Sequence, residues 1–264
     1  MRFPLRHGSD NLFADAIDGD TGNRGMSRII AISHDTEDAD DRCTVWLRAN
    51  GYDVATVCPA AGETIPELAG DVAGVVVFGG KYDVGRQAEF PFLRDEMRLI
   101  EATLERELPY LGICLGGQLL AHVLGEKVDR HPEGHAEYGY YDLEPTAEGR
   151  AVFGHGLKVL QSHWHGWYRT PRGATRLAAT ALFPEQAFRH GRAHYGLQFH
   201  PEATRDMLQR WIGRRPAERH ALKGAFSPER QLADNSLHDA ALGHWFHGFL
   251  DRWIGPATRR EAAE

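Results

Sequence analysis

The chain has few cysteines and no long apolar run. Three cysteines in 264 residues, at positions 43, 58 and 114, are too few and too widely spaced for a disulfide framework. No stretch approaches the roughly 18 apolar residues that a membrane-spanning helix requires. The first 25 residues also lack the apolar segment of a secretory signal. We therefore expect a reduced, cytoplasmic protein with no membrane partner.

Positive charge and phosphate-binding motifs are scarce as well. Thirty Lys and Arg residues against 37 Asp and Glu residues give a formal net charge of −7. This charge argues against a nucleic-acid partner, because binding to a phosphate backbone needs a basic face. The sequence also has no G-x-x-x-x-G-K-[ST] phosphate loop. We expect no nucleotide site and no cofactor.

Apolar strands and amphipathic helices alternate through the first half of the chain. Apolar runs predict strands at 28–33, 53–57, 72–78 and 110–113, and periodicity predicts helices near 43–50, 92–107 and 118–124. The unbroken run Val75–Phe78 indicates burial on both faces, as in a parallel sheet. The order favours an α/β fold with an open, mainly parallel sheet flanked by helices on both faces. Ligands of such sheets bind beyond the carboxyl ends of the strands.

The pattern changes from about residue 126 onward. Aromatic and β-branched residues mixed with glycine and proline predict short antiparallel additions to the sheet at 138–143, 157–160, 187–190 and 195–199. Apolar faces within 203–254 predict helices that dock on the core. We expect a flexible N-terminal tail over 1–25, a single domain over 26–254 and a C-terminal tail over 255–264. A docked strand or helix within the first 25 residues is the open alternative.

One segment, Gly112-Ile113-Cys114-Leu115-Gly116-Gly117, joins a predicted strand to a predicted helix. It matches the G-x-C-x-G nucleophile elbow, with sulfur in place of a serine hydroxyl. A Cβ two residues before or after the nucleophile would collide with neighbouring chain, so the pattern needs glycine there. The start of a helix also favours a thiolate. A buried structural cysteine in a glycine-rich turn is the alternative.

A thiolate nucleophile needs a base and a group that orients that base. His200 directly follows the predicted strand 195–199, at the end of the sheet where ligands bind. Glu202 lies two residues on, close enough to hold one imidazole nitrogen. Because the chain contains 15 histidines, a surface histidine beside a solvated glutamate is an open alternative.

Gly112–Gln118 and Phe199–Glu202, with Gly79-Gly80 upstream, resemble the motifs of class I (triad-type) glutamine amidotransferases. The resemblance covers roughly residues 28–202 and is to the stand-alone, guanylate-synthase-like proteins. It implies that glutamine, or a γ-glutamyl small molecule, loses its side-chain nitrogen through a glutamyl thioester. Gly117 stands where the synthase-linked enzymes have histidine, and few residues follow Glu202. We therefore expect no synthase domain in this chain, and a separate ammonia-accepting synthase subunit stays an open alternative.

The resemblance also implies roles for individual residues. It implies a catalytic triad of Cys114, His200 and Glu202, an oxyanion hole at Gly80 and Leu115, and substrate contacts from Gly79, Gln118, Ser162 and His163. Gln118 as a cap of the helix start is an equal alternative. His163 and His165 would lie on one face of a strand, but they lack a third ligand of suitable spacing, so we predict no metal site.

Three other functions stay open. The chain could be a γ-glutamyl peptide hydrolase that works without a synthase. The elbow also fits dienelactone-hydrolase-like enzymes, although these place an acidic residue between the nucleophile and a late histidine. A non-catalytic regulatory protein on the same fold is the third, but such a protein would not need cysteine, histidine and glutamate together.

Overall fold

The structure, a computed structural model, describes residues 27–36 and 40–257. The predicted N-terminal tail, and residues 258–264 of the predicted C-terminal tail, lie outside the described residues. The single domain over 26–254 stays a prediction. Within the described ranges, no helix has the length and apolar character needed to cross a membrane.

One sheet of nine strands forms the centre of the molecule. Its strands, in spatial order, are β2 (Asp53–Val57), β1 (Arg28–Ile32), β3 (Val72–Val77), β4 (Tyr110–Ile113), β11 (His194–Leu197), β10 (Ala187–His190), β9 (Ala174–Ala179), β6 (Glu137–Pro145) and β7 (Leu157–His163). The first five pair in parallel, and the remaining pairings are antiparallel. A separate two-stranded sheet contains β5 (Val128–Arg130) and β8 (His165–Trp167).

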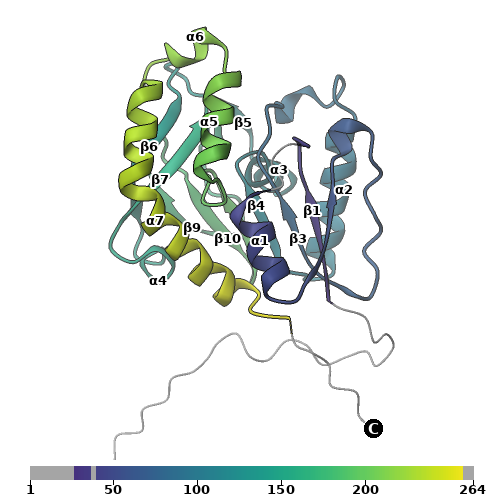
Figure 1. Ribbon diagram of the computed structural model, residues 1–264. Coiled ribbons are helices and arrows are strands. Elements are labelled where there is room, and N and C mark those ends of the chain that lie inside the picture. The colour runs from purple at the N-terminus through teal and green to yellow at the C-terminus, as the bar shows by residue number, and fades with distance from the viewer. Residues whose placement is uncertain (1–26, 37–39, 258–264) are drawn as a thin grey trace, which may run out of the picture.

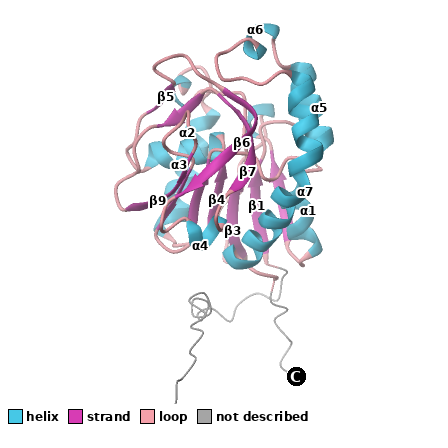
Figure 2. Ribbon diagram, turned by 90° about the vertical axis from the view of Figure 1, so that its left-hand side faces the viewer, coloured by secondary structure: helices cyan, strands magenta, loops and turns pink. Residues whose placement is uncertain are grey.

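Helices cover both faces of the sheet. The longer ones are α1 (Arg42–Ala49), α2 (Phe92–Glu105), α3 (Leu115–Val123), α5 (Arg205–Arg214) and α7 (Pro228–Trp253). Short helices are α4 (Arg150–Phe153) and α6 (Ala217–His220), with single 3-10 turns η1 (Pro59–Ala61) and η2 (Val84–Arg86). Figures 1 and 2 show α1, α5 and α7 on one side of the sheet and α2 and α3 on the other.

Alternate residues of the parallel strands pack into two separate apolar clusters, one on each face of the sheet. Ile29 and Val76 pack with residues of α1 and α7, whereas Ile30 and Val75 pack with residues of α2 and α3. All four side chains are fully buried. The predicted burial of both faces is therefore confirmed, as is the α/β fold with an open, mainly parallel sheet and helices on both sides.

The strand predictions hold best in the first half of the chain. There, each strand lies within one residue of its predicted bounds. Residues 195–199 are predicted to form an antiparallel strand. This prediction is correct for the pairing of β11 with β10 but wrong for its pairing with β4, which is parallel. An apolar run does not encode strand direction, which depends here on the hairpin turn before His194. The strands β5, β8 and β9 were not predicted.

Candidate functional site

Cys114 lies where β4 turns into α3, with backbone angles φ 51° and ψ −104°. Such a positive φ is strained for a residue with a Cβ. A Cβ on Gly116 would lie 2.0 Å from the Val77 carbonyl oxygen, and one on Gly112 would lie 2.4 Å from the Gly116 carbonyl oxygen. Backbone contacts this close exclude any side chain, so the predicted reason for both glycines is confirmed.

The parallel pairing of β4 with β11 brings the two distant motifs to the same edge of the sheet. The Cys114 amide donates to the Leu197 carbonyl over 2.7 Å, at the point where the second motif begins. His200 Nδ1 lies 2.8 Å from Glu202 Oε1. A Cβ added to Gly79 would lie 2.6 Å from His200 Cε1 and 3.3 Å from Cys114 Cβ. The imidazole and the thiol-bearing side chain therefore meet above Gly79.

The His200–Glu202 pair is buried, with 4% and 2% of these residues exposed, so it is not a solvated surface pair. Burial disfavours the imidazolium, but the Glu202 carboxylate and the Cys114 sulfur outweigh burial and raise the pKa of His200 to about 10. The Nε2 atom of this imidazole is buried and has no hydrogen-bond partner among the described residues. The site therefore holds a charged imidazolium between a carboxylate and a sulfur at neutral pH.

Residues from two helices hold this pair in place. The Arg42 amide, in the first turn of α1, donates to the Glu202 carbonyl over 2.8 Å, and the Arg42 guanidinium donates to the Pro201 carbonyl over 3.3 Å. The Trp211 ring of α5 meets the His200 imidazole edge-on at a centroid distance of 4.8 Å. The loop that carries Glu202 is thus anchored through its main chain.

A buried histidine supports the Gly79-Gly80 loop from below. His34 Nδ1 lies 3.0 Å from the Gly79 carbonyl, and its Nε2 lies 3.1 Å from both carboxylate oxygens of Glu96 in α2. Because a carbonyl oxygen only accepts, Nδ1 is the donor in the first bond. A Cβ on Gly80 would lie 2.8 Å from His34 Cγ and 3.0 Å from Leu115 Cδ2. This close fit fixes the loop beside the start of α3.

Leu115 and Gln118 occupy the first turn of α3. Leu115 is the first residue of the helix, so its N–H has no intrahelical partner. Gln118 Nε2 donates to the His165 carbonyl over 3.1 Å and to Gln198 Oε1 over 3.2 Å, and Gln198 Nε2 lies 3.6 Å from Cys114 Sγ. Gln118 therefore does not cap its own helix, and the capping alternative is wrong. Its contact with a substrate stays a prediction.

Ser162 and His163 point to different surroundings. Ser162 Oγ accepts from Arg215 Nη2 over 2.9 Å. His163 is buried, with Nδ1 2.8 Å from the His165 carbonyl and Nε2 3.0 Å from Glu137 Oε2. Both ring nitrogens of His163 are thus occupied by neighbouring protein groups, and the ring fixes the turn into β8. Contacts of Ser162 and His163 with a substrate stay predictions.

The histidines considered for a metal site lie on different strands. His163 ends β7 and His165 begins β8, so they do not share the face of one strand. Across residues 27–36 and 40–257, no group of three or more His, Cys, Asp or Glu side chains is placed to hold a metal ion.

Three residues of this region belong to no motif that the sequence analysis identifies. His34 and Glu96 lie far apart in the chain, and neither spacing nor periodicity connects them. Gln198 directly precedes the Phe199–Glu202 motif, and its position at a strand end next to that motif was the available signal.

The fold and this arrangement define an α/β protein in which a cysteine elbow faces a histidine–glutamate pair in the loop after the neighbouring parallel strand. The family model described as "Glutamine amidotransferase class-I" matches residues 44–210. The chain belongs to the class I glutamine amidotransferase family.

Individual relatives agree with this assignment. YfeJ of Salmonella typhimurium, described as glutamine amidotransferase-like, is 31% identical over 191 residues, which cover 69% of this chain and 78% of YfeJ. The glutamine-hydrolyzing GMP synthase of Paraburkholderia phytofirmans is 36% identical over 156 residues, which cover 53% of this chain but 28% of that synthase. A glutamine amidotransferase structure from Thermotoga maritima superposes with a TM-score of 0.77 at 30% identity, covering 87% of this chain and 99% of that one.

Proposed function

We propose that the protein hydrolyses the side-chain amide of glutamine or of a γ-glutamyl compound. The observation that carries this proposal is the buried His200 imidazole, which lies 2.8 Å from Glu202 and packs above Gly79 together with the Cys114 side chain. A nucleophile, a base and an orienting carboxylate in this order are what acyl transfer from an amide requires.

In the first half of the reaction, the Cys114 thiolate attacks the amide carbon, and the carbonyl oxygen becomes an oxyanion. The Gly80 and Leu115 N–H groups are the proposed donors to this oxyanion, and one such donor typically lowers the barrier by about 3 kcal/mol. The C–N bond then breaks. The leaving nitrogen takes the proton from the His200 imidazolium and departs as ammonia or an amine, leaving a glutamyl thioester on Cys114.

In the second half, water attacks the thioester carbon. The His200 imidazole, now neutral, takes a proton from this water, and Glu202 stabilises the imidazolium that forms again. The C–S bond breaks and glutamate leaves. Each step uses only side chains and backbone N–H groups of the site together with water, so the proposed reaction needs no cofactor. Free thiol chemistry suits the reduced, cytoplasmic setting inferred above.

The second candidate is an ammonia-producing subunit of a synthase. The likeness to proteins named glutamine-hydrolyzing GMP synthases supports it, although this chain spans less than a third of the matched synthase. A dienelactone-hydrolase-like triad fits less well, because Glu202, and not an acidic residue between the motifs, contacts His200.

The test measures ammonia released from L-glutamine and amine released from γ-glutamyl amides by the purified chain. Cys114→Ala should lower kcat by at least about 10⁴-fold, because it removes the nucleophile. Cys58→Ala is the matched control, since it makes the same substitution at another buried cysteine outside the site.

Activity of Cys114→Ala close to that of the wild type would remove the proposed mechanism. Ammonia release that begins only after a synthase subunit is added would favour the second candidate. An ester and lactone panel with the same two variants distinguishes the hydrolase alternative.

A further inference from the structure

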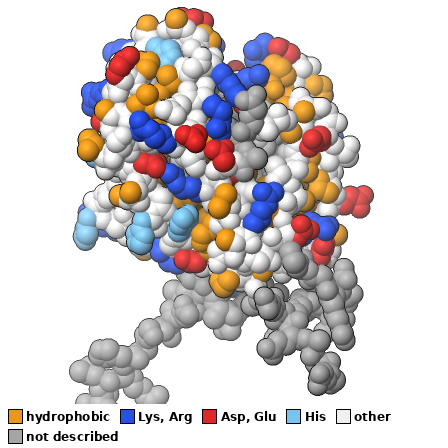
Figure 3. All heavy atoms as spheres, in the orientation of Figure 1, with side chains coloured by type: hydrophobic (Ala, Val, Ile, Leu, Met, Phe, Trp, Pro, Cys, Tyr) orange, Lys and Arg blue, Asp and Glu red, His pale blue; other side chains and the backbone are white. Residues whose placement is uncertain are grey.

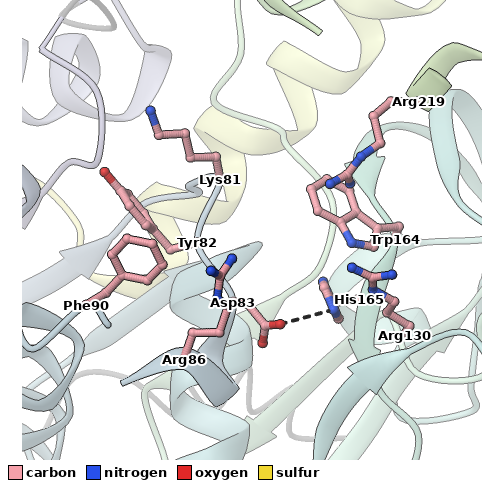
Figure 4. A pocket seen from close by; sticks show the side chains of 9 residues that line it. All are labelled: Lys81, Tyr82, Asp83, Arg86, Phe90, Arg130, Trp164, His165 and Arg219. Carbon is pink, nitrogen blue, oxygen red and sulfur yellow. Dashed lines mark ion pairs between the residues drawn. The ribbon is translucent and has the colours of Figure 1, made fainter. Parts of the chain in front are cut away.

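A cavity of about 380 Å³ lies between the segment that follows Gly80 and the start of β8, and this size lies within the usual range of small-molecule sites. Two walls face each other across it (Figure 4). One wall comes from the segment after Gly80, and the other comes from the start of β8, from β5 and from α6. The lining residues are Lys81, Tyr82, Asp83, Arg86, Phe90, Arg130, Trp164, His165 and Arg219.

Both walls are direct continuations of the proposed site. Lys81 follows the Gly79-Gly80 loop, and Trp164 follows His163. The His165 carbonyl accepts a hydrogen bond from Gln118 Nε2, which also donates to Gln198 Oε1. Gln198 Nε2 in turn lies 3.6 Å from Cys114 Sγ. Two segments of the proposed site therefore border the cavity: the Gly79-Gly80 loop through Lys81, and the turn into β8 through Trp164 and His165.

Tyr138 provides a second connection between Cys114 and the cavity. Burial is the main cause that raises the pKa of Tyr138, and the nearby Cys114 adds to it, while Arg215 and Arg219 oppose it. The Tyr138 and Trp164 rings lie 6.5 Å apart, and the Arg219 guanidinium lies 3.3 Å from the Trp164 ring centroid. Arg219 therefore reaches both the cavity and the surroundings of the nucleophile.

The lining carries an excess of positive charge. It contains Lys81, Arg86, Arg130 and Arg219 against the single carboxylate of Asp83, which lies 3.5 Å from His165. Arg86 pairs with Glu89, but among the ion pairs of residues 27–36 and 40–257 none involves Lys81, Arg130 or Arg219. This excess is unusual in a chain whose net charge is −7. On the face seen in Figure 3, by contrast, acidic and basic side chains are interspersed.

Aromatic rings lie beside three of these cations, the first of which is Lys81, whose Nζ lies 5.8 Å from the Tyr82 ring centroid. The Arg219 guanidinium stacks on Trp164, and that of Arg86 lies 5.3 Å from the Phe90 ring centroid. Such contacts keep the charge without neutralising it. The cavity is therefore built to receive negative charge from a ligand.

We propose that this cavity binds a carboxylate on the leaving amine, so that the substrates are γ-glutamyl amino acids or peptides. This inference rests on the proposed function and narrows its substrate class. The α-carboxylate of a glutamyl group is accompanied by its own α-ammonium, so that group alone brings no net charge. Lys81, Arg130 and Arg219, which form no ion pair within the described part of the chain, match a substrate with a second carboxylate beyond the scissile amide.

The experiment compares kcat/KM for γ-glutamylglycine and for γ-glutamylethylamide, two amides of similar size of which only the first has a carboxylate on the leaving group. Free glutamine is the third substrate. The wild type should prefer γ-glutamylglycine over the ethylamide by about tenfold or more, and added salt should reduce this preference because the cations are partly exposed.

Arg130→Gln should reduce the glycine-to-ethylamide ratio about tenfold, since it removes an exposed cation of the cavity and leaves the core untouched. Arg219→Gln should act in the same direction. Arg192→Gln is the control, because this exposed arginine lies in the turn between β10 and β11, away from the cavity.

Equal kcat/KM for the two amides in the wild type, with no change of the ratio in Arg130→Gln and Arg219→Gln, overturns this inference and leaves amide hydrolysis standing. A wild type that hydrolyses neither amide, nor glutamine, overturns the proposed function itself. The two failures are therefore distinguishable in one series of assays.

Discussion

The two halves of the sheet are built on different principles. The parallel half, β2, β1, β3, β4 and β11, buries apolar side chains on both faces and ends in the groups proposed to react. The antiparallel half, β10, β9, β6 and β7, buries a layer of polar side chains. The parallel half carries the proposed catalytic residues, and the antiparallel half supports the turn into β8, which forms one wall of the cavity.

The polar layer centres on Glu137, which is fully buried in β6. Its carboxylate accepts from Thr180 Oγ1 over 2.6 Å and from Gln186 Nε2 over 2.8 Å, and it lies 3.0 Å from His163 Nε2. His163 then holds the His165 carbonyl. A carboxylate buried without these partners would be costly, so the layer fixes one arrangement of the turn into β8.

The largest effect is expected from Gly116→Ala, which breaks the parallel half at its closest backbone contact. The added Cβ would lie 2.0 Å from the Val77 carbonyl oxygen, and backbone atoms on both sides cannot move apart without separating α3 from β3. We expect loss of folded protein, measured by circular dichroism and thermal melting.

Gly213→Ala in α5 is the matched control for Gly116→Ala. No atom lies within 4 Å of the added Cβ at this position. Alanine favours helix over glycine by about 1 kcal/mol, so this variant should melt at or above the wild-type temperature. Equal melting of Gly116→Ala and Gly213→Ala would show that the elbow does not depend on its glycines.

A smaller effect is expected from Glu137→Ala, which breaks the antiparallel half. Removing Glu137 takes one acceptor from each of three buried groups, Thr180, Gln186 and His163, and should lower the free energy of unfolding by about 3 kcal/mol. At about 2–4 °C per kcal/mol, the melting temperature should fall clearly but the fold should persist.

The control for Glu137→Ala is Glu144→Ala, an exposed position of the same strand. Its free energy of unfolding should stay within about 0.5 kcal/mol of the wild-type value. Equal destabilisation by both variants would mean that the polar layer adds nothing beyond strand propensity.

The smallest effect is expected on the pH profile of Glu202→Gln. In the wild type the pKa of His200 is raised to about 10, so the imidazolium persists below that pH and is lost as pH rises through it. Removing the Glu202 charge leaves burial less opposed and lowers this pKa. We expect the alkaline limb of kcat/KM to move to lower pH, with about tenfold lower activity at neutral pH.

An alkaline limb that stays in place in Glu202→Gln would show that the carboxylate does not act on the imidazole. The same sign applies to stability. The contribution of the charged His200 to folding is fully present below its unfolded pKa of 6.5 and is lost as pH rises toward 10.

The parallel half was predictable from the sequence because its signals are local. An unbroken apolar run, a glycine pattern around one cysteine and a histidine at a strand end each lie within a few residues. His34, Glu96 and Gln198 were missed because their partners are distant in the chain. The parallel pairing of β11 with β4 was missed as well, because the sequence predicts β11 to be antiparallel. The cavity was missed too, as its cations come from three separate segments.

The position of β11 has a consequence for the order of events during folding. It is the last strand of the sheet in the sequence, yet it inserts in the middle of the sheet, between β4 and β10. The chain must close a long loop before this insertion, and such closures are slow. A polypeptide emerging from the ribosome therefore carries Cys114 well before its imidazole partner has been synthesised, so the nucleophile stays without its base until assembly of the sheet is nearly complete.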